Sequence, residues 1–263
     1  MSNENKFAVI SDIHSNLEAL TVVLDDIEKR GIKKIYCLGD IVGYGPNPRE
    51  CMDLIMQKTE LCVMGNHDYA AMYEPTNFNY AAEQASFWTR ENLENEEDPE
   101  KRAKRWNFLG GLSMKLSIEM ELGGEKANID FVHASPRKPI NEYIFPDDVY
   151  NVPNKIESLF DRFAHLCFVG HTHVPGVFSS TPDFYTPEEV DWSYEVEPKQ
   201  KALINVGSVG QPRDRDTRAS YVVVNDDAVD FIRVEYDVES VAQKVLSIPE
   251  LDNYLGQRLK DGR

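Results

Sequence analysis

The chain has 263 residues, of which 41% are hydrophobic and 10% aromatic, a composition typical of a globular protein with one sizeable core. Asp and Glu (45) outnumber Lys and Arg (28) and give a net charge of −17, which argues against extended nucleic acid as a partner because such binding needs basic surfaces. The sequence shows neither a basic and apolar leader nor an apolar run near the roughly 20 residues of a membrane span. We therefore expect a cytoplasmic protein with no membrane partner, either monomeric or oligomeric.

The N-terminal part alternates between short apolar runs and helical patterns. The runs cover residues 6–11, 33–38 and 61–64, and each is followed by a polar turn, which predicts βαβ units with a buried, mostly parallel sheet. Between the first two runs, Leu residues recur at helical spacing, and Ser15 with Glu18 matches a capping box that would begin this helix. Asn47 followed by Pro48 predicts the start of a second helix.

The middle of the chain predicts an inserted helical segment. Residues 72–112 contain helix-forming stretches at 80–93 and 101–108 around an acidic run, and we expect them to form a cap over the strand ends. A peripheral helical pair is the alternative. Tyr80 and Trp88 in this segment are candidates for stacking on a planar ligand.

Strand patterns dominate the C-terminal part. A helix with its apolar face at Ile156, Leu159 and Phe160 leads into a strand at residues 166–169, and residues 179–200 lack a period and predict a long loop. The β-branched runs at 202–206, 221–224 and 229–236 predict a second, partly antiparallel sheet packed on the first, its last two strands joined by a tight turn. We expect all of residues 1–263 to form one domain.

Five short segments hold five of the six histidines, each at the end of an apolar run. A single His in such a place is usually structural, but five together indicate a metal site. Carboxylate, amide and imidazole ligands suit Mn, Fe, Zn, Co or Ni better than Ca, and seven such side chains are enough for two adjacent divalent ions. In extended geometry, Asp12 and His14 would point the same way and bind one ion. The segments are Asp12-Ile13-His14, Gly39-Asp40, Gly65-Asn66-His67-Asp68, His133 and Gly170-His171-Thr172-His173.

In this order the segments resemble those of the calcineurin-like metallophosphoesterase superfamily. The resemblance implies an α/β (α+β) fold in which a two-sheet β-sandwich is flanked by helices. It also implies a binuclear centre with Asp40 shared between two ions, and in-line attack on phosphorus by a hydroxide held between them. The implied ligands are Asp12, His14 and His173 for the first ion and Asn66, His133 and His171 for the second.

The same resemblance assigns His67 as a general acid facing the leaving group, with Asp68 orienting it. The protein Ser/Thr phosphatases of the superfamily carry two phosphate-clamping arginines in their Gly-Asp and Asn-His motifs, and both are missing here. Three segments instead resemble the small bacterial and archaeal phosphodiesterase group, often labelled diadenosine-tetraphosphatase-like: 12–17, 133–137 and 205–213. From them we expect Asn16, Arg137 and Arg213 to contact substrate, the arginines by bidentate phosphate contacts; an exposed mixed-charge loop is the alternative for 213–218.

The sequence thus predicts a binuclear metal-dependent phosphoesterase that hydrolyses a small phosphodiester or nucleotide. A phosphomonoesterase or a protein phosphatase is the alternative. A non-enzymatic interaction module of this fold is disfavoured by the intact set of seven ligands, and a nuclease is disfavoured by the acidic charge balance.

Overall fold

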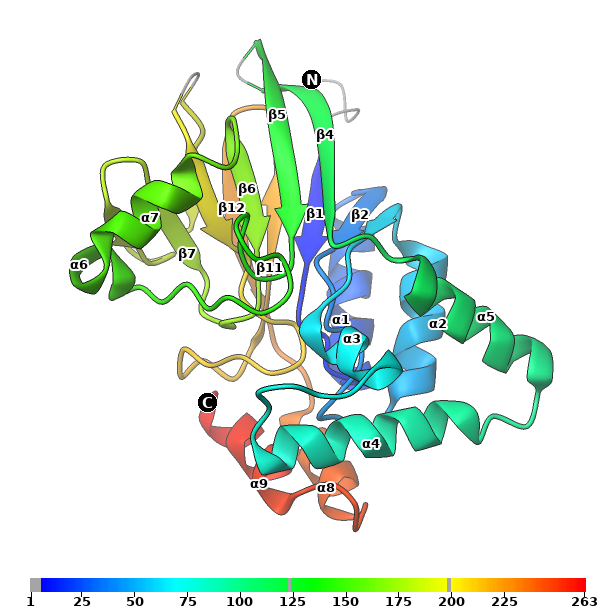
Figure 1. The fold of residues 1–263 in the computed structure, drawn as a ribbon. Coiled ribbons are helices and arrows are strands. Elements are labelled where there is room, and N and C mark those ends of the chain that lie inside the picture. Colours follow the sequence, from blue (N-terminus) through cyan, green and yellow to red (C-terminus); the bar gives the residue numbers. More distant parts are fainter. Residues whose placement is uncertain (1–5, 123, 198–199) are drawn as a thin grey trace.

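The structure is a computed structural model that describes residues 6–122, 124–197 and 200–263. Two six-stranded sheets lie face to face with helices on their outer sides (Figure 1). This is the two-sheet α/β sandwich that the sequence predicts.

The first sheet contains the three N-terminal strands and the two strands of the C-terminal hairpin. Its members are β1 (Phe7–Ile10), β2 (Lys34–Cys37), β3 (Leu61–Cys62), β9 (Ser193–Glu195), β11 (Ala219–Val224) and β12 (Ala228–Val234). The order is β3-β2-β1-β11-β12-β9. Strands β1, β2 and β3 are parallel, as predicted, and β11 pairs with β1 in antiparallel fashion.

The second sheet is built around another parallel group. Its members are β4 (Lys115–Leu122), β5 (Glu125–Val132), β6 (Leu166–Val169), β7 (Gly176–Ser179), β8 (Asp183–Tyr185) and β10 (Ala202–Asn205). The order is β4-β5-β6-β10-β7-β8, with β5, β6 and β10 parallel. The expectation that the C-terminal strands form the second sheet together is therefore wrong: only β10 joins it, whereas β11 and β12 complete the first. The predicted loop at 179–200 contains the short strands β8 and β9.

Alternating side chains of each strand serve two different cores. In β1, Phe7 and Val9 face the layer between the sheets, while Ala8 and Ile10 face the helices outside the first sheet. The second sheet does the same, because Phe168 lies between the sheets and Cys167 packs with Leu159 beneath the outer helices. The period of two residues in a strand thus builds three apolar layers.

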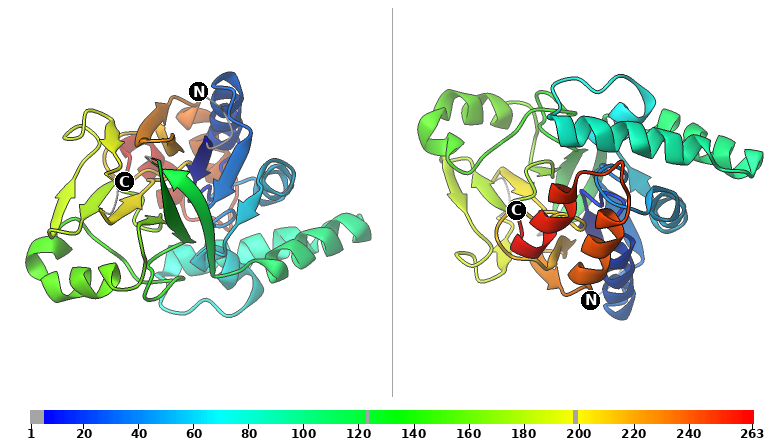
Figure 2. Two further views of the ribbon diagram at one scale, coloured as in Figure 1. Left: turned by 90° about the horizontal axis from the view of Figure 1, so that it is seen from above. Right: turned by 90° about the horizontal axis from the view of Figure 1, so that it is seen from below.

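The helices are α1 (Leu17–Lys29), α2 (Pro48–Lys58), α3 (Asn66–Met72), α4 (Tyr80–Glu94), α5 (Pro99–Gly111), α6 (Asp148–Asn151), α7 (Pro153–Phe160), α8 (Val238–Leu246), α9 (Asn253–Gln257) and a final 3₁₀ turn, η1 (Arg258–Asp261). Helices α1 and α2 lie beside the first sheet and α6 and α7 beside the second, while α8 and α9 lie at one end of the molecule (Figures 1 and 2). Among the described residues, no helix combines the length and apolar content needed to cross a bilayer.

The predicted capping box of α1 is wrong. Asn16 is the N-cap and its Oδ1 accepts a hydrogen bond from the Ala19 amide at 3.0 Å. Ser15 has φ of +54° and its amide donates to the Ile41 carbonyl at 2.9 Å, so Ser15 belongs to the preceding loop.

Helices α4 and α5 form the inserted hairpin. Its far half packs on α2, where Arg105 of α5 binds Asp53 with Nη2–Oδ2 at 2.7 Å, and Figure 1 shows α5 reaching away from the sandwich. The near end of α4 packs against α8 and α9 in a small cluster that includes Trp88. The hairpin thus packs on α2, α8 and α9, and its role as a cap stays a prediction.

Candidate metal centre

The predicted ligands converge because each follows a parallel strand. Asp12 follows β1, Asp40 follows β2 and Asn66 begins the helix after β3; His133 follows β5, and His171 and His173 follow β6. The carboxyl ends of these strands meet at one edge of the sandwich, where ligands commonly bind in α/β sheets. All seven side chains belong to buried residues.

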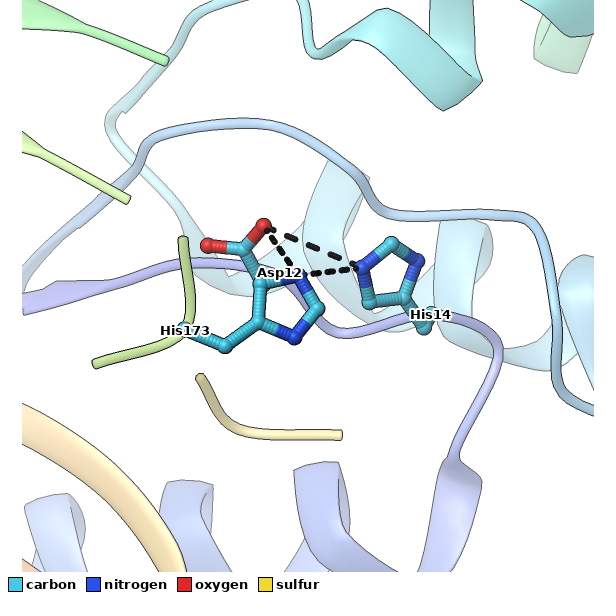
Figure 3. Close-up of side chains that lie close together, drawn as sticks. All are labelled: Asp12, His14 and His173. Atoms are coloured by element: carbon cyan, nitrogen blue, oxygen red, sulfur yellow. Dashed lines mark hydrogen bonds and ion pairs between the residues drawn. The ribbon is translucent and has the colours of Figure 1, made fainter. Parts of the chain in front are cut away.

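Asp12, His14 and His173 form the first cluster (Figure 3). His173 Nε2 lies 3.1 Å from Asp12 Oδ1 and 3.1 Å from His14 Nε2. His14 Nε2 lies 3.8 Å from Asp12 Oδ1. Two ring nitrogens and one carboxylate oxygen thus face a common point, with contributions from both sheets.

Asp40, His133 and His171 form the second cluster. His133 Nε2 lies 3.3 Å from Asp40 Oδ2, 3.2 Å from His171 Nδ1 and 2.9 Å from Asn66 Oδ1. The same Asp40 Oδ2 lies 3.6 Å from His14 Nε2 of the first cluster. One carboxylate oxygen therefore connects the two groups.

Backbone carbonyls orient two of the imidazoles. His133 Nδ1 lies 2.9 Å from the Leu38 carbonyl, and His173 Nδ1 lies 2.5 Å from the Gln211 carbonyl. Because each Nδ1–H donates to its carbonyl, Nε2 of each ring points into its cluster and can bind a metal ion there once it has lost its proton.

The backbone at the ligands is left-handed, and the predicted extended geometry at Asp12 and His14 is wrong. Asp12, His14 and Asp40 have φ of 53°, 47° and 51°. Hydrogen bonds hold this conformation, since the amides of Asp12 and His14 donate to the carbonyls of Gly39 and Asp40 at 3.0 and 2.9 Å. Such φ values are unfavourable for residues with a Cβ and concentrate at functional sites.

Two glycines permit the close approach of loops to the carboxylates. A Cβ at Gly65 would lie 2.1 Å from Asp40 Oδ1, and a Cβ at Gly170 would lie 2.3 Å from Asp12 Oδ2. Glycine is therefore required at both positions, because any side chain would displace a ligand carboxylate.

The clusters fit divalent cations. Imidazole nitrogens 3.1–3.2 Å apart cannot both carry a proton, and buried carboxylates require a compensating positive charge. Burial opposes protonation of His133, but Asp40 and Asp12 outweigh it and raise the pKa of His133 to about 9. Burial and the charge of His133 lower the pKa of His171 to about 3. Nitrogen and oxygen donors of this kind match borderline transition metals.

His67 lies beside the first cluster, but Asp68 does not orient it. The Asp68 carboxylate accepts hydrogen bonds from the amides of Gly65 at 3.0 Å and Ile41 at 2.9 Å, so it caps α3 and fixes the loop after β2. His67 Nδ1 has no hydrogen-bond partner within the part of the chain that the structure describes. The predicted hydrogen bond by which Asp68 would orient His67 is therefore absent from the described residues.

Arg213 is the substrate-binding candidate that the structure brings to the site. Its guanidinium carbon lies 5.9 Å from the centre of the Tyr44 ring, which is 4.3 Å from the His67 ring and 4.7 Å from the His14 ring. Arg213 Nη2 donates to Gln211 Oε1 at 2.7 Å.

The other two candidates have structural partners instead. Arg137 Nε donates to both carboxylate oxygens of Glu142 at 3.1 and 3.2 Å. Asn16 uses Oδ1 to cap α1 and donates from Nδ2 to the Gly210 carbonyl at 2.8 Å. Both side chains are thus engaged by partners within the protein, and their contact with substrate stays a prediction.

Sequence reasoning missed three aromatic residues at the site. Tyr44 contacts His14 and His67, Phe78 lies 4.7 Å from His67, and Tyr143 stacks on His171 at 4.1 Å. Their side chains have neither a nitrogen nor a carboxylate, so they were not among the candidate metal ligands. The only signal was that Tyr44 closely follows Asp40 in a glycine-rich turn.

Comparison with known proteins agrees with this geometry. A model of the calcineurin-like phosphoesterase superfamily domain matches residues 6–228. The chain belongs to this superfamily. As a member it is a metal-dependent phosphoric ester hydrolase.

Several known proteins match nearly the whole chain. It is 43% identical over 265 residues to the uncharacterized protein MJ0912 of Methanocaldococcus jannaschii, covering 99% of both chains. It is 34% identical to a metallophosphoesterase of Sphaerobacter thermophilus, whose crystal structure matches with a TM-score of 0.77 over 98% of this chain and 100% of that one. The hypothetical protein PH1004 of Pyrococcus horikoshii shares the fold, with a TM-score of 0.70 at 21% identity and 98% coverage of both chains.

Proposed function

We propose that this phosphoesterase uses two divalent ions, bridged by Asp40, to hydrolyse a small phosphodiester or nucleotide. The supporting observation is the position of Asp40 Oδ2, 3.6 Å from His14 Nε2 and 3.3 Å from His133 Nε2. One oxygen within reach of both clusters is what a shared ligand requires. The ligand sets are those that the sequence predicts, with Asn66 in the second.

The side chains around the centre have distinct roles in this proposal. When bound, the ions would activate a water for attack on phosphorus and neutralise phosphate charge. Arg213 would hold a phosphate oxygen by charge-assisted hydrogen bonds. His67, on the same side as Arg213 and Tyr44, would donate a proton to the leaving oxygen.

Small substrates are favoured because the chain has a net charge of −17, which repels an extended polyanion and leaves attraction to local cations. Manganese is one of the metals that the ligands suit. A cytoplasmic location, a monomeric or oligomeric state and hydrolysis of phosphomonoesters stay predictions.

The first experiment removes the shared ligand. Asp40→Asn, which loses the charge but keeps the size, should bind fewer ions than the roughly two per chain expected of the wild type by elemental analysis, and should lose hydrolysis of bis-p-nitrophenyl phosphate with Mn²⁺. Asp226→Asn in the β11–β12 turn is the matched control and should keep both. Full activity and full metal content in Asp40→Asn would sink the shared-ligand proposal.

A further inference from the structure

Two exposed aromatic rings extend from a candidate metal ligand toward solvent. Tyr143 lies over the His171 ring with centroids 4.1 Å apart and planes at 28°. Phe145 is parallel to Tyr143, with centroids 5.4 Å apart and planes at 2°. We call Tyr143 and Phe145 the aromatic platform. It begins in direct contact with the second cluster.

The platform is open to solvent. Tyr143 is 44% exposed and Phe145 is 49% exposed, although apolar burial would favour covering both rings. Single exposed aromatics are common and need no explanation. Two parallel rings beside a catalytic centre differ, because their aromatic faces share one orientation in which a planar group of a ligand can stack.

One ion pair holds the backbone of both platform residues. Lys155 Nζ donates to the Tyr143 carbonyl at 2.7 Å and to Asp148 Oδ2 at 2.5 Å, and the same Asp148 Oδ2 accepts a hydrogen bond from the Phe145 amide at 2.8 Å. Lys155 belongs to α7 and Asp148 to α6. Two helices therefore hold in place a loop that has no regular secondary structure of its own. The rings are thus positioned in advance of binding, which lowers the entropy lost when a ligand stacks on them.

The platform and His67 adjoin different clusters. Tyr143 contacts His171 of the second cluster, whereas His67 lies 5.0 Å from His14 of the first. A substrate phosphate at the two clusters would therefore meet the platform at the second cluster and the proposed proton donor at the first.

We propose that the aromatic platform stacks a nucleobase, so that the substrate is a nucleotide ester whose nucleoside is not the leaving group. This inference rests on the proposed function. It adds the base and its position to a site that otherwise recognises only phosphate. Stacking on aromatic side chains tolerates every base because each base has a π face, so we expect selection for a nucleoside without strong selection among bases.

The test compares two substrates with one leaving group. Thymidine 5′-(p-nitrophenyl phosphate) and methyl p-nitrophenyl phosphate differ only in the group retained on phosphorus. Tyr143→Leu keeps apolar bulk but removes the π face, and should raise KM for the thymidine ester by about 10–100-fold, the range of base stacking, with little change for the methyl ester. Tyr143→Phe should behave as wild type. Tyr150→Ala, which removes a ring that is 73% exposed on α6, is the control and should leave both substrates unchanged.

Binding without turnover gives an independent measurement. In proton NMR titrations of the Mg²⁺-loaded or metal-free protein, the H2 and H8 protons of AMP should shift upfield with wild type and not with Tyr143→Leu, while ribose 5-phosphate should bind the two proteins equally. Equal losses on both p-nitrophenyl esters, with no base shift, would mean that Tyr143 only supports His171, and would overturn the platform role. If the wild type loaded with Mn²⁺ hydrolysed neither ester, the proposed function itself would be wrong, whatever the role of the platform.

Discussion

His67 is the proposed proton donor, yet burial favours the neutral form of its imidazole. Its ring lies between those of Tyr44 and Phe78, with centroids 4.3 and 4.7 Å away. Burial lowers the pKa of His67 to about 4, against the attraction of Asp40 and with the help of Arg213. A phosphate anion bound by Arg213 would offset that guanidinium charge and raise the pKa of His67, which is the direction that a proton donor needs.

This role predicts a dependence on the leaving group. His67→Gln should keep its metal but lose about 10²–10⁴-fold in kcat on alkyl esters, the usual scale of general acid catalysis. Esters of p-nitrophenol need less proton donation and should lose less. Steady-state rates on a series of leaving groups would check this, and an equal loss across the series would contradict the role of proton donor.

Arg213 and Arg137 allow a matched comparison. Arg213→Lys should lower kcat/KM by at least about tenfold, or about 1.4 kcal/mol, because an ammonium cannot make the planar bidentate contact of a guanidinium. Arg137→Lys should be near wild type, since Arg137 donates to Glu142. A larger loss of kcat/KM in Arg137→Lys than in Arg213→Lys would instead assign the phosphate contact to Arg137.

At the scale of elements, the periodic segments could be predicted and the irregular ones could not. The apolar faces of α1 and α7 follow from spacing alone. Apolar and polar residues alternate along Lys115–Leu122, which is a strand signal that could also have been recognised. The N-cap of α1 is Asn16 and not Ser15, because the loop after β1 turns left-handed to reach the loop after β2. That turn depends on contacts with residues that are distant in the sequence.

The same distinction applies to the candidate site. Its metal ligands could be predicted because each follows a strand, and parallel strands end at one edge. The hydrogen-bond partners of Asp68 could not be predicted, because its carboxylate binds the backbone amides of Ile41 and Gly65 and not the adjacent His67. Arg137 lies in a loop without a period, so nothing in the sequence says that it faces Glu142.

One hydrogen bond links the first sheet to α1 and predicts a pH-dependent stability. Tyr221 Oη donates to Asp26 Oδ2 at 2.6 Å. Burial raises the pKa of Asp26, but this bond and the Arg30 guanidinium outweigh it and lower the pKa below its ordinary value of about 3.8. Because the folded-state pKa is the lower one, the stabilisation is complete above the unfolded pKa and is lost as pH falls through the folded pKa.

Tyr221→Phe should accordingly reduce the free energy of unfolding by about 1 kcal/mol at pH 7, and the difference from wild type should shrink at acidic pH. Urea titrations at pH 7 and pH 3 would measure it. The double variant with Asp26→Asn is the control, since the two changes should not add. A difference that grew on acidification would refute the assigned cause.

On the scale of the whole molecule, each ligand cluster joins the two sheets. Asp12 and His14 follow the first sheet, whereas His173 follows the second; Asp40 and His133 divide in the same way. A ligand that binds only the folded state stabilises it by mass action, by about 4 kcal/mol at a thousand times its Kd. The ions should therefore stabilise the sandwich as a whole.

Calorimetry should show this as a difference in Tm. Chelator-treated protein should unfold several degrees below protein reloaded with Mn²⁺, and Asp40→Ala should show little shift on adding metal. Identical transitions with and without metal in the wild type would mean that the clusters do not bind ions tightly.

The distribution of ligands along the chain has a consequence for the order of synthesis. Residues up to Asn66 supply the ligands from the first sheet, but the first cluster also needs His173 and the second needs His171. Neither ligand set is complete until the ribosome has passed these residues and β6 has paired with its neighbours. No complete ligand set therefore exists before the two sheets come together, so uptake of metal should mark correct assembly.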